Sequence, residues 1–408
     1  MKIWIFNNYS HLPDQGGLNR HYFFARQLQK MGHEPVVFTG SHPHNTSMQM
    51  IEGREAYRVG QAEPFPWVYV RTCNYEGSLL KRVWSMLQFY RNAKKAAAHF
   101  GRPDVILGSS PHPLDAVLAI RLGKKYACRS IAEVRDLWPE SIVAYGVAGP
   151  HNPAVIALRG LEKWIYKKAD SLIFTLEGAY DYIIEQGWGK SIPRSKVHYI
   201  NNGVDLEAFR HNREHCRIDD PDLTDPDIFR VVYVGSVRQV NHLGGLLDAA
   251  KKVEDPRIRF LIWGDGDERP ALEQRVRDEK IPNVKFKGRV DKKYIPYIVS
   301  CADLNLIHSG SEGDSLFRFG ISFNKMFDCL AAGKPILMDI VASYNPVEQW
   351  KAGFCFKDAK DIPDAIERVR NADPESRRLM EQNACRAAEN FDFRVLTEKL
   401  ICVMEGKA

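Results

Sequence analysis

The feature that most constrains the fold of this chain is an order of elements that occurs twice. A short apolar run, a glycine-containing loop and a helical stretch follow one another from residue 2, in "KIWIFNNYSHLPDQGGLNRHYFFARQLQKMG". The same order begins again at residue 229, in "FRVVYVGSVRQVNHLGGLLDAAKK". Further β-branched runs, such as "DVILGSS", "SLIFTLE" and "DLNLIHS", also precede a loop and a helical stretch. This alternation predicts two α/β domains in tandem, each with a parallel, doubly wound sheet.

The length of 408 residues also favours two domains, because it exceeds what one hydrophobic core usually serves. The turn-rich "YINNGVDLEAF" is followed by the acidic "DDPDLTDPD", whose two prolines suit a linker. We therefore place the domains at residues 1–204 and 205–389. The last helix, "VLTEKLICVMEG" within residues 390–408, is amphipathic and able to pack across either domain, and we place it back on the first.

Composition excludes several classes of protein. The 44% of hydrophobic and 26% of charged residues are those of a soluble globular chain, and no run reaches the length of apolar residues that a membrane span needs. The net charge of +6 comes without a basic run interleaved with aromatics, which argues against nucleic acid as a partner. The 8 cysteines are scattered, without C-x-x-C spacing, so we expect a reducing cytoplasmic compartment and neither disulfides nor a zinc site.

Two glycine loops are candidates for anion binding, since ligands of open α/β sheets bind beyond the carboxyl ends of the strands. Gly16 and Gly17 would let the backbone approach a ligand beside a helix N-terminus, or they form no more than a tight turn. In the second domain Arg238, two residues after Ser236, would grip a phosphate, or it is a solvated loop arginine. Neither loop contains the G-x-G-x-x-G or Walker pattern.

Acidic pairs formally resemble metal-binding D-x-D motifs. One follows Gly264, in "WGDGDERP", and the other two lie in "DDPDLTDPD". Helix capping explains the first and a solvated linker explains the others, so we predict no metal.

Polar residues at two further strand ends are suited to sugar recognition. His112 lies between prolines in "SSPHPLDA", and Arg135 and Asp136 precede Trp138 in "EVRDLWPES". A carboxylate can bind sugar hydroxyls while an indole stacks on the sugar ring. The alternative is an Arg–Asp ion pair beside a core tryptophan.

The stretch "LLKRVWSMLQFYRNAKKAAAHF" is basic and amphipathic. It predicts either an ordinary surface helix with one buried face or a helix that lies on an anionic membrane surface.

The strongest signal is "RFGISFNKMFDCLAAGKPIL", residues 318–337, which predicts a loop, a helix from Asn324 and a strand. Lys325 and Asp328 are three residues apart, so they share one side of this helix. They form either a surface ion pair or a pair of ligand-binding groups at a helix start.

Together with "GGLNRHYFFARQLQKMGHEPVVFT", "EVRDLWPESIV", "NNGVD", "WGDGDE" and "VKFKGRV", this stretch resembles family 4 of the retaining glycosyltransferases. The resemblance runs in matching order from residue 1 to about residue 400 and is strongest to the branch of bacterial O-antigen and capsule assembly. It implies the GT-B fold, in which two Rossmann-like doubly wound domains face each other across a cleft that binds a nucleotide sugar.

The resemblance also implies roles for individual residues. Asp328 would bind the nucleoside ribose, Lys325 would face the phosphates, and the chain at Arg289 and Val290 would flank the base. The implied donor-side residues are Gly17, Ser236, Arg238, Gly264, Arg289, Val290, Gly320, Ile321, Asn324, Lys325 and Asp328. The implied acceptor-side residues are His112, Arg135 and Asp136, and the implied catalytic residues are Lys325, Arg238 and Asp136.

Two departures from the family pattern concern the donor site. The family has two glutamates eight residues apart, and here Gly320 stands eight residues before Asp328. The usual arginine and lysine of the second domain's first loop are also missing as a pair, with Ser236 near the place of the arginine. Lys325 and Arg238 would supply the charge instead, and Glu312 or Asp314 would contact the donor sugar.

The resemblance therefore predicts metal-independent, cofactor-free transfer of a hexosyl or N-acetylhexosaminyl group, with UDP as the expected nucleotide and GDP as the next. The expected acceptor is a lipid-diphosphate-linked or oligosaccharide molecule at the inner face of the plasma membrane, which the protein would contact peripherally. The alternatives are a catalytically impaired GT-B scaffold and a GT-B epimerase or phosphorylase.

Overall fold

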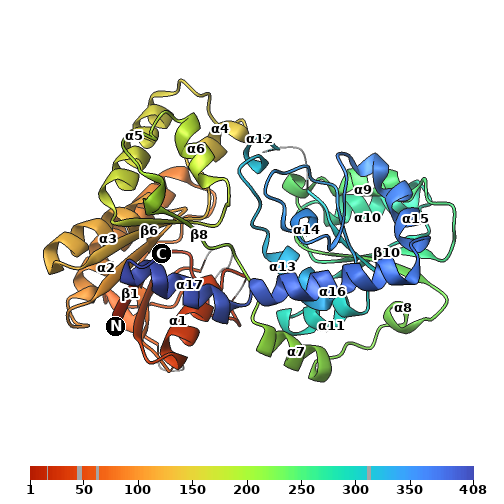
Figure 1. Ribbon diagram of the computed structural model, residues 1–408, viewed down its shortest axis with the longest axis horizontal. Helices are drawn as coiled ribbons and strands as arrows, with labels where there is room; N and C mark the ends of the chain where they lie inside the picture. The colour runs from red at the N-terminus through yellow and green to blue at the C-terminus, as the bar shows by residue number, and fades with distance from the viewer. Residues whose placement is uncertain (16, 44–47, 61–63, 310–313) are drawn as a thin grey trace. The chain divides into compact units, whose positions relative to one another are not determined.

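The computed structural model describes residues 1–15, 17–43, 48–60, 64–309 and 314–408 (Figure 1). It divides the chain into two compact units. Unit 1 comprises Met1–Asn201 with Phe393–Ala408, and unit 2 comprises Asn202–Asp392. The divisions that we placed after residues 204 and 389 each lie three residues from these. The two α/β domains with parallel sheets that the sequence predicts are confirmed.

Unit 1 is built on an eight-stranded sheet of order β3-β4-β2-β1-β5-β6-β7-β8, in which every pairing is parallel except that of β3 with β4. Its strands are β1 (Lys2–Phe6), β2 (Glu34–Gly40), β3 (Tyr57–Val59), β4 (Trp67–Val70), β5 (Val105–Ser109), β6 (Arg129–Val134), β7 (Ser171–Phe174) and β8 (Val197–Tyr199). Its helices are α1 (Arg20–Lys30), α2 (Leu79–Ala97), α3 (Pro113–Tyr126), α4 (Glu140–Ala144), α5 (Pro153–Lys168), α6 (Ala179–Glu185), η1 (Arg194–Lys196) and α17 (Phe393–Glu405).

Aromatic side chains fill the core of unit 1 because its central strands are buried on both faces. Phe6 of β1 stacks on Phe38 of β2, with ring centroids 4.7 Å apart. These rings share one apolar cluster with Phe89 of α2 and Leu118 of α3.

The last helix, α17, belongs to unit 1. Phe393, its first residue, stacks on Phe23 of α1 with ring centroids 4.8 Å apart and meets Phe24 edge-on at 5.5 Å. The apolar side of this amphipathic helix therefore covers α1, close in space although the two segments lie at opposite ends of the sequence (Figure 1).

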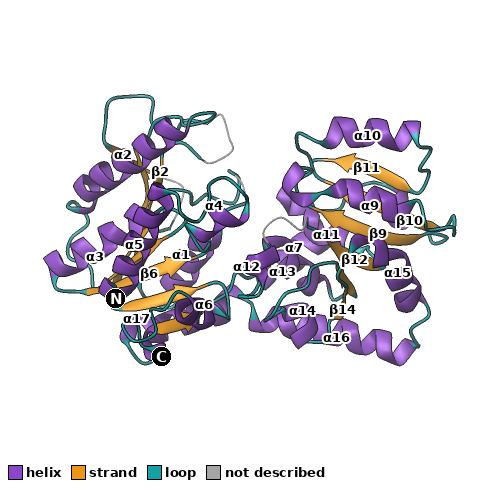
Figure 2. Ribbon diagram, turned by 90° about the horizontal axis from the view of Figure 1, so that it is seen from above, coloured by secondary structure: helices purple, strands orange, loops and turns teal. Residues whose placement is uncertain are grey.

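Unit 2 has a wholly parallel six-stranded sheet of order β11-β10-β9-β12-β13-β14, with helices packed around it (Figure 2). Its strands are β9 (Phe229–Val234), β10 (Ile258–Trp263), β11 (Val284–Gly288), β12 (Leu304–Ile307), β13 (Ile336–Met338) and β14 (Gly353–Cys355). Its helices are α7 (Leu206–His215), α8 (Pro221–Thr224), η2 (Gln239–Asn241), α9 (Leu243–Ala250), α10 (Arg269–Asp278), η3 (Lys292–Tyr294), α11 (Ile295–Ser300), α12 (Asp314–Phe317), α13 (Asn324–Ala332), α14 (Pro346–Gln349), η4 (Ala359–Asp361), α15 (Ile362–Arg370) and α16 (Pro374–Asn390).

The prediction that "DDPDLTDPD" is a linker is wrong. The segment lies within unit 2 and forms α8, whose N-cap is Asp220. Leu223 is only 4% exposed and packs in a cluster with Trp263. Asp220 and Asp222 accept hydrogen bonds from Lys287, 2.8 and 2.5 Å away. The acidic residues therefore balance lysines of the sheet edge rather than solvate a flexible connection.

Within the part of the chain that the structure describes, no helix has both the length and the apolar character that crossing a bilayer requires.

Candidate functional site

The strongest cluster of polar groups in unit 2 lies where β9, β12 and β13 end, and Lys325 at the start of α13 joins these strand ends. Its ammonium donates to the carbonyl oxygen of His308, 2.9 Å away, and to the hydroxyl of Tyr233, 3.4 Å away. It also lies 4.6 Å from the centre of the Tyr233 ring. Tyr233 in turn donates to the carbonyl oxygen of Ser236 at 3.1 Å. Lys325 is thus fixed at the carboxyl edge of the sheet, where ligands of α/β sheets bind.

The environment of Lys325 adjusts its charge. Burial lowers the pKa of Lys325 to about 8, while Cys329 and Asp339 act in the opposite direction. The side chain therefore remains mainly a cation at neutral pH. No side chain caps the N-terminus of α13 among the described residues, so this end presents backbone N–H groups together with an ammonium. The combination suits an anionic ligand.

A buried histidine–aspartate pair supports this edge. Nδ1 of His308 contacts a carboxylate oxygen of Asp339, and Nε2 lies 3.0 Å from the carbonyl oxygen of His242. Because a carbonyl oxygen only accepts, Nε2 carries a hydrogen and donates a hydrogen bond to the carbonyl oxygen of His242. His242 has a φ of 47°, in the left-handed region, at the turn between η2 and α9. The pair therefore holds the loop that bears Ser236 and Arg238 in an otherwise unfavourable conformation.

The first loop of unit 2 is ordered by its own residues. The Asn241 amide donates to the carbonyl and hydroxyl oxygens of Ser236, both at 2.8 Å. Arg238 is exposed, and its guanidinium has no hydrogen bond or ion pair with any residue that the structure describes. Either interpretation of Arg238, phosphate ligand or solvated arginine, remains compatible with this position.

The backbone conformation and close packing at residue 264 require glycine. Its φ is 147°, and a Cβ there would lie 1.7 Å from the carbonyl oxygen of Gly235. The residue thus lets the end of β10 approach the loop after β9, which is a packing role and does not require a ligand.

The charged neighbour of Asp328 is Lys292 and not Lys325. Burial raises the pKa of Asp328, and the charge of Lys292 in η3 lowers it. Lys292 lies two residues after Val290, so the chain at Arg289 and Val290 is on the Asp328 side of α13. Between Lys325 and Asp328, both within the described ranges, there is no ion pair. The ion-pair alternative for these two residues is therefore wrong.

Part of the segment before α13 is buried. Gly320 and Ile321 are buried, whereas Asn324 is exposed at the helix start. The amide N–H of Gly320 donates to the carbonyl oxygen of Phe317 at 3.0 Å. Asp314 begins α12, and Glu312 and Gly16 lie outside the described residues.

Unit 1 contains a buried ionic network that the sequence did not single out. Glu133, at the end of β6, accepts from Arg20 at 2.9 Å, His21 at 2.7 Å and Ser109 at 2.7 Å. Burial raises the pKa of Glu133, but Arg20 and His21 outweigh it and hold that pKa well below its usual range. Arg20 also donates to the carbonyl oxygens of Ile200 and Asn201, at 2.7 and 2.5 Å. A charged residue within the apolar "SIAEV" and an Arg-His pair after the glycine loop were the available signals.

Gly17, in the loop before this network, is exposed, and a Cβ there would meet nothing within 4 Å. The local packing thus does not demand glycine at this position, which leaves room for a ligand to approach.

A pocket of about 490 Å³ opens in unit 1 at the ends of β5 and β6. Arg135 and Asp136 line it with Trp138, as the sequence predicts for a sugar site, and the two charged residues form no ion pair with each other within the described chain. The remaining lining residues are Tyr9, Leu18, Arg82, Pro111, Ser141, Ile142, Tyr145 and Val147.

His112 does not line this pocket and is 0% exposed. Its ring packs near Tyr9 and Phe89, and its Nδ1 lies 3.1 Å from a carboxylate oxygen of Asp115. His112 instead lines the smaller pocket described next.

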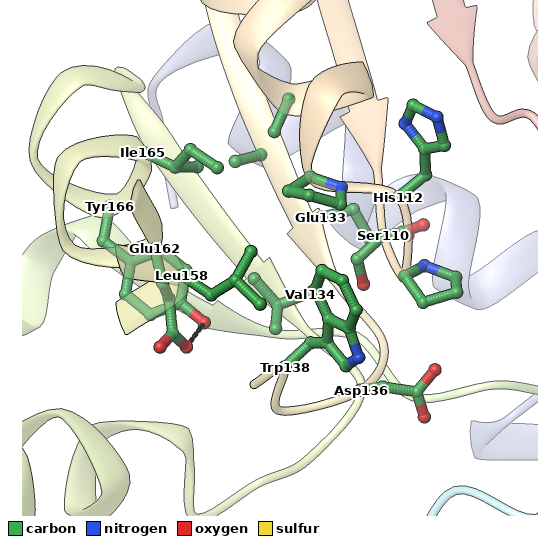
Figure 3. A pocket seen from close by; sticks show the side chains of 14 residues that line it. Ser110, His112, Glu133, Val134, Asp136, Trp138, Leu158, Glu162, Ile165 and Tyr166 are labelled. Carbon is green, nitrogen blue, oxygen red and sulfur yellow. Dashed lines mark hydrogen bonds between the residues drawn. The ribbon is translucent and has the colours of Figure 1, made fainter. Parts of the chain in front are cut away.

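A second, smaller pocket of about 40 Å³ adjoins the first (Figure 3). Glu162 of α5 lies on one side of it and accepts hydrogen bonds from Tyr166 at 2.7 Å and Tyr182 at 2.9 Å. Burial raises the pKa of Glu162 to about 8, so this carboxyl is mainly uncharged at neutral pH.

Comparison with known proteins relates both units to transferases. Residues 15–208 match the family model described as "Glycosyltransferase Family 4", and residues 228–371 match "Glycosyl transferases group 1". A probable glycosyltransferase WbjE of Pseudomonas aeruginosa is 25% identical over 62% of this chain, and the match spans 61% of that relative's length. The putative colanic acid biosynthesis glycosyl transferase WcaI of Escherichia coli K12 is 23% identical over 75% of this chain and 76% of its own length.

Solved structures resemble the whole chain in fold. Anabaena Alr3699/HepE in complex with UDP covers 99% of this chain and 100% of its own, with a TM-score of 0.67 and 14% identity. An E. coli trehalose-6-phosphate protein bound with UDP-2-fluoro glucose covers 99% of both chains, with a TM-score of 0.71 and 12% identity.

Proposed function

Because the chain belongs to glycosyltransferase family 4 and has the GT-B fold, we propose that it transfers a sugar, with retention, from a UDP-sugar to a lipid-diphosphate-linked or oligosaccharide acceptor in bacterial surface polysaccharide assembly. The observation that carries the proposal is the Lys325 ammonium at the uncapped start of α13, on the carboxyl edge of the sheet of unit 2. UDP is the proposed nucleotide because the HepE structures contain UDP or UDP-glucose.

In the proposed reaction, the bond between the anomeric carbon and the β-phosphate oxygen breaks, and its electron pair stays on the phosphate. The acceptor oxygen bonds to the anomeric carbon from the same face, and its proton passes to the leaving phosphate. Lys325, Arg238 and the N–H groups at Asn324 would stabilise the charge that builds on that phosphate, without a metal or cofactor. A charge already fixed in place needs no reorganisation during the reaction.

The nucleoside would bind on the other side of α13. Asp328 would accept hydrogen bonds from the ribose hydroxyls, and the backbone at Arg289 and Val290 would meet the base edge. The burial that raises the pKa of Asp328 also strengthens hydrogen bonds to it.

Asp328→Asn should raise the dissociation constant of UDP about tenfold, since hydrogen bonds to a charged group are worth about 1.5–3 kcal/mol. Calorimetric titration measures it, with Asp364→Asn, an exposed carboxylate of α15, as the matched control. The wild type should also prefer UDP to 2′-deoxy-UDP, and the variant should lose part of that preference. An unchanged constant for both nucleotides would remove Asp328 from the ribose site.

The acceptor would bind in the 490 Å³ pocket of unit 1, whose volume suits a small ligand. Trp138 offers part of its ring, Asp136 offers a carboxylate to hydroxyls, and Arg82 and Arg135 suit a diphosphate. Asp136 would orient the attacking hydroxyl.

Peripheral contact with an anionic membrane at the inner face of the plasma membrane is the proposed setting. Five apolar side chains on the first half of α2 are exposed, with Leu80 the most open at 83%: Leu79, Leu80, Val83, Trp84 and Leu87. Basic residues flank them, namely Lys81, Arg82, Arg91, Lys94 and Lys95. An apolar strip bordered by cations is typical of helices at lipid interfaces.

Replacing both Leu80 and Trp84 by serine should weaken binding to phosphatidylglycerol vesicles at least about tenfold, because burying one such side chain is worth about 1.5–3 kcal/mol. Vesicle co-sedimentation measures this, and Ile184→Ser, an exposed apolar residue of α6, is the control. Equal sedimentation of both variants would contradict a docking role for α2.

Release of UDP from UDP-sugars tests the function as a whole. Release that depends on an acceptor supports the transferase. A catalytically impaired scaffold, favoured by Gly320 in place of the family glutamate, would bind UDP without turnover. Conversion of the UDP-sugar without any acceptor would indicate an epimerase.

A further inference from the structure

The two pockets of unit 1 share part of their lining. Pro111, Asp136 and Trp138 line both. In Figure 3 the indole of Trp138 lies between Asp136 and the Glu162–Tyr166 pair. Trp138 is only partly buried, so part of its ring is open to a ligand.

The smaller pocket is apolar where it is open. Its walls come largely from small or aliphatic side chains, namely Pro113, Ala116, Ala132, Val134, Leu158 and Ile165. Ala116 and Ala132 leave the space that a larger residue would fill. The volume of about 40 Å³ exceeds what one water molecule needs but admits only a group of one or two heavy atoms.

Glu133, Ser110 and Glu162 beside the smaller pocket are satisfied within the protein, whereas the ring nitrogens of His112, which also lines it, are buried without a hydrogen bond among the described residues. Glu133 is held by Arg20, His21 and Ser109, and Ser110 accepts from the backbone N–H of Arg135 at 2.7 Å. The Glu162 carboxyl accepts from Tyr166 and Tyr182 and is mainly uncharged at neutral pH. A hydroxyl entering this pocket would find few free partners, and burying it unpaired is unfavourable. A methyl group makes no hydrogen bonds in water, so it would lose none on entering this pocket.

We propose that the smaller pocket is a specificity subsite that receives a methyl group carried by the acceptor sugar, which lies in the larger pocket against Trp138. The inference rests on the proposed function, which places the acceptor in unit 1. The methyl group comes either from a 6-deoxy sugar or from an acetamido substituent. Both present the same apolar, methyl-sized end to Leu158 and Ala132.

Two matched pairs of sugars test the subsite. L-rhamnose differs from L-mannose in a methyl in place of a hydroxymethyl group, and N-acetylglucosamine differs from glucose in its acetamido group. Dissociation constants are measured by saturation-transfer NMR in the presence of UDP. The methyl-bearing member of one pair should bind at least about tenfold more tightly, with its methyl protons receiving the strongest saturation. The pair that shows the preference identifies the source of the methyl group.

Two variants fill the subsite from different sides. Ala132→Val narrows it from the buried strand β6, and Leu158→Phe narrows it from the partly exposed surface of α5, where folding tolerates a larger ring more easily. Each should abolish the preference and leave binding of the sugar without the methyl group unchanged. Ile156→Phe, an exposed residue of the same helix, should keep the preference.

Equal binding within both pairs, failure of all four sugars to bind, or a preference that survives both filling variants would overturn the subsite. Its failure is distinguishable from failure of the proposed function. A protein that is stabilised by UDP and releases UDP with an acceptor, yet shows no methyl preference, keeps the function and loses the subsite. A protein that prefers the methyl-bearing sugar but neither binds UDP nor turns over a UDP-sugar loses the function.

Discussion

Replacing Lys325 by methionine should lower kcat/KM for sugar transfer about 10²-fold, without lowering the temperature of unfolding. The ammonium is fixed by contacts with both the His308 carbonyl and the Tyr233 ring. It would therefore stabilise the leaving phosphate without first being reorganised. Methionine keeps most of the length and apolar stem of lysine, so packing beneath the helix is retained. Lys334→Met, at the opposite end of α13, is the matched control.

The pKa of Lys325 gives this prediction a pH dependence. In the protein without ligand, Lys325 is protonated below about pH 8 and loses its proton as the pH rises through that value. The protonated form is the one that attracts a diphosphate. The dissociation constant of UDP should therefore rise between pH 7 and pH 9, by up to about tenfold, since about one molecule in ten keeps the charge one unit above the pKa. Titrations of the wild type and of the Lys334 control should share this slope.

For Lys325→Met, the dissociation constant of UDP should not change between pH 7 and pH 9, because the group that titrates in this range has been removed. Wild-type turnover in this variant, or an unchanged pH slope, would remove Lys325 from phosphate binding. Loss of turnover together with a lowered unfolding temperature would instead indicate a structural role.

The largest effect on stability is expected at Glu133. Replacing it by glutamine should lower the free energy of unfolding by about 3–5 kcal/mol at pH 7, because Arg20 would remain buried without its countercharge. Urea denaturation measures the change, and Glu76→Gln, an exposed glutamate of unit 1, should alter stability little. A loss below about 1 kcal/mol would mean that the network contributes no more than an ordinary surface pair.

The sign of the pH dependence follows from the lowered pKa of Glu133. A carboxyl whose pKa is lower in the folded protein adds stability above its unfolded pKa, near 4.3, and loses it as the pH falls toward the folded value. The difference in unfolding free energy between wild type and Glu133→Gln should therefore have its largest value at pH 7 and should decrease below about pH 4. A difference that grows on acidification would contradict the ionic account.

Local sequence patterns were sufficient to predict the strand that opens each domain and the helix that begins at Asn324. The apolar runs "KIWIF" and "FRVVYV" became β1 and β9, and the helix expected from Asn324 begins there. The short strands β3, β4 and β8 were not predicted.

Long-range contacts were beyond the sequence. Arg20 and Glu133 are 113 residues apart, and the pairing of β1 with β5 and of β5 with β6 brings the carboxylate to the start of α1. The acidic stretch before β9 failed as a prediction for the same reason, since the lysines that balance it lie more than 60 residues away in β11. Composition alone cannot distinguish a solvated acidic segment from a paired one.

In the candidate site, the sequence predicted which residues share a helix but not which residues surround them. The spacing of Lys325 and Asp328 placed them on one helix, but only the surrounding strand ends show that one meets Tyr233 and the other lies near Lys292. His112 appeared accessible at a strand end, yet the rings of Tyr9 and Phe89 enclose it. Exposure depends on neighbours that no short motif contains.

The return of α17 to unit 1 has a consequence for synthesis of the protein. Phe393–Ala408 leaves the ribosome after all of Asn202–Asp392, so the chain of unit 2 is complete before that of unit 1. During this interval the side of α1 that Phe393 later covers, around Phe23, stays open to water. Chains that end at Asp392 should therefore contain all of unit 2 but lack the last helix of unit 1, the reverse of the usual N-terminal-first completion of domains.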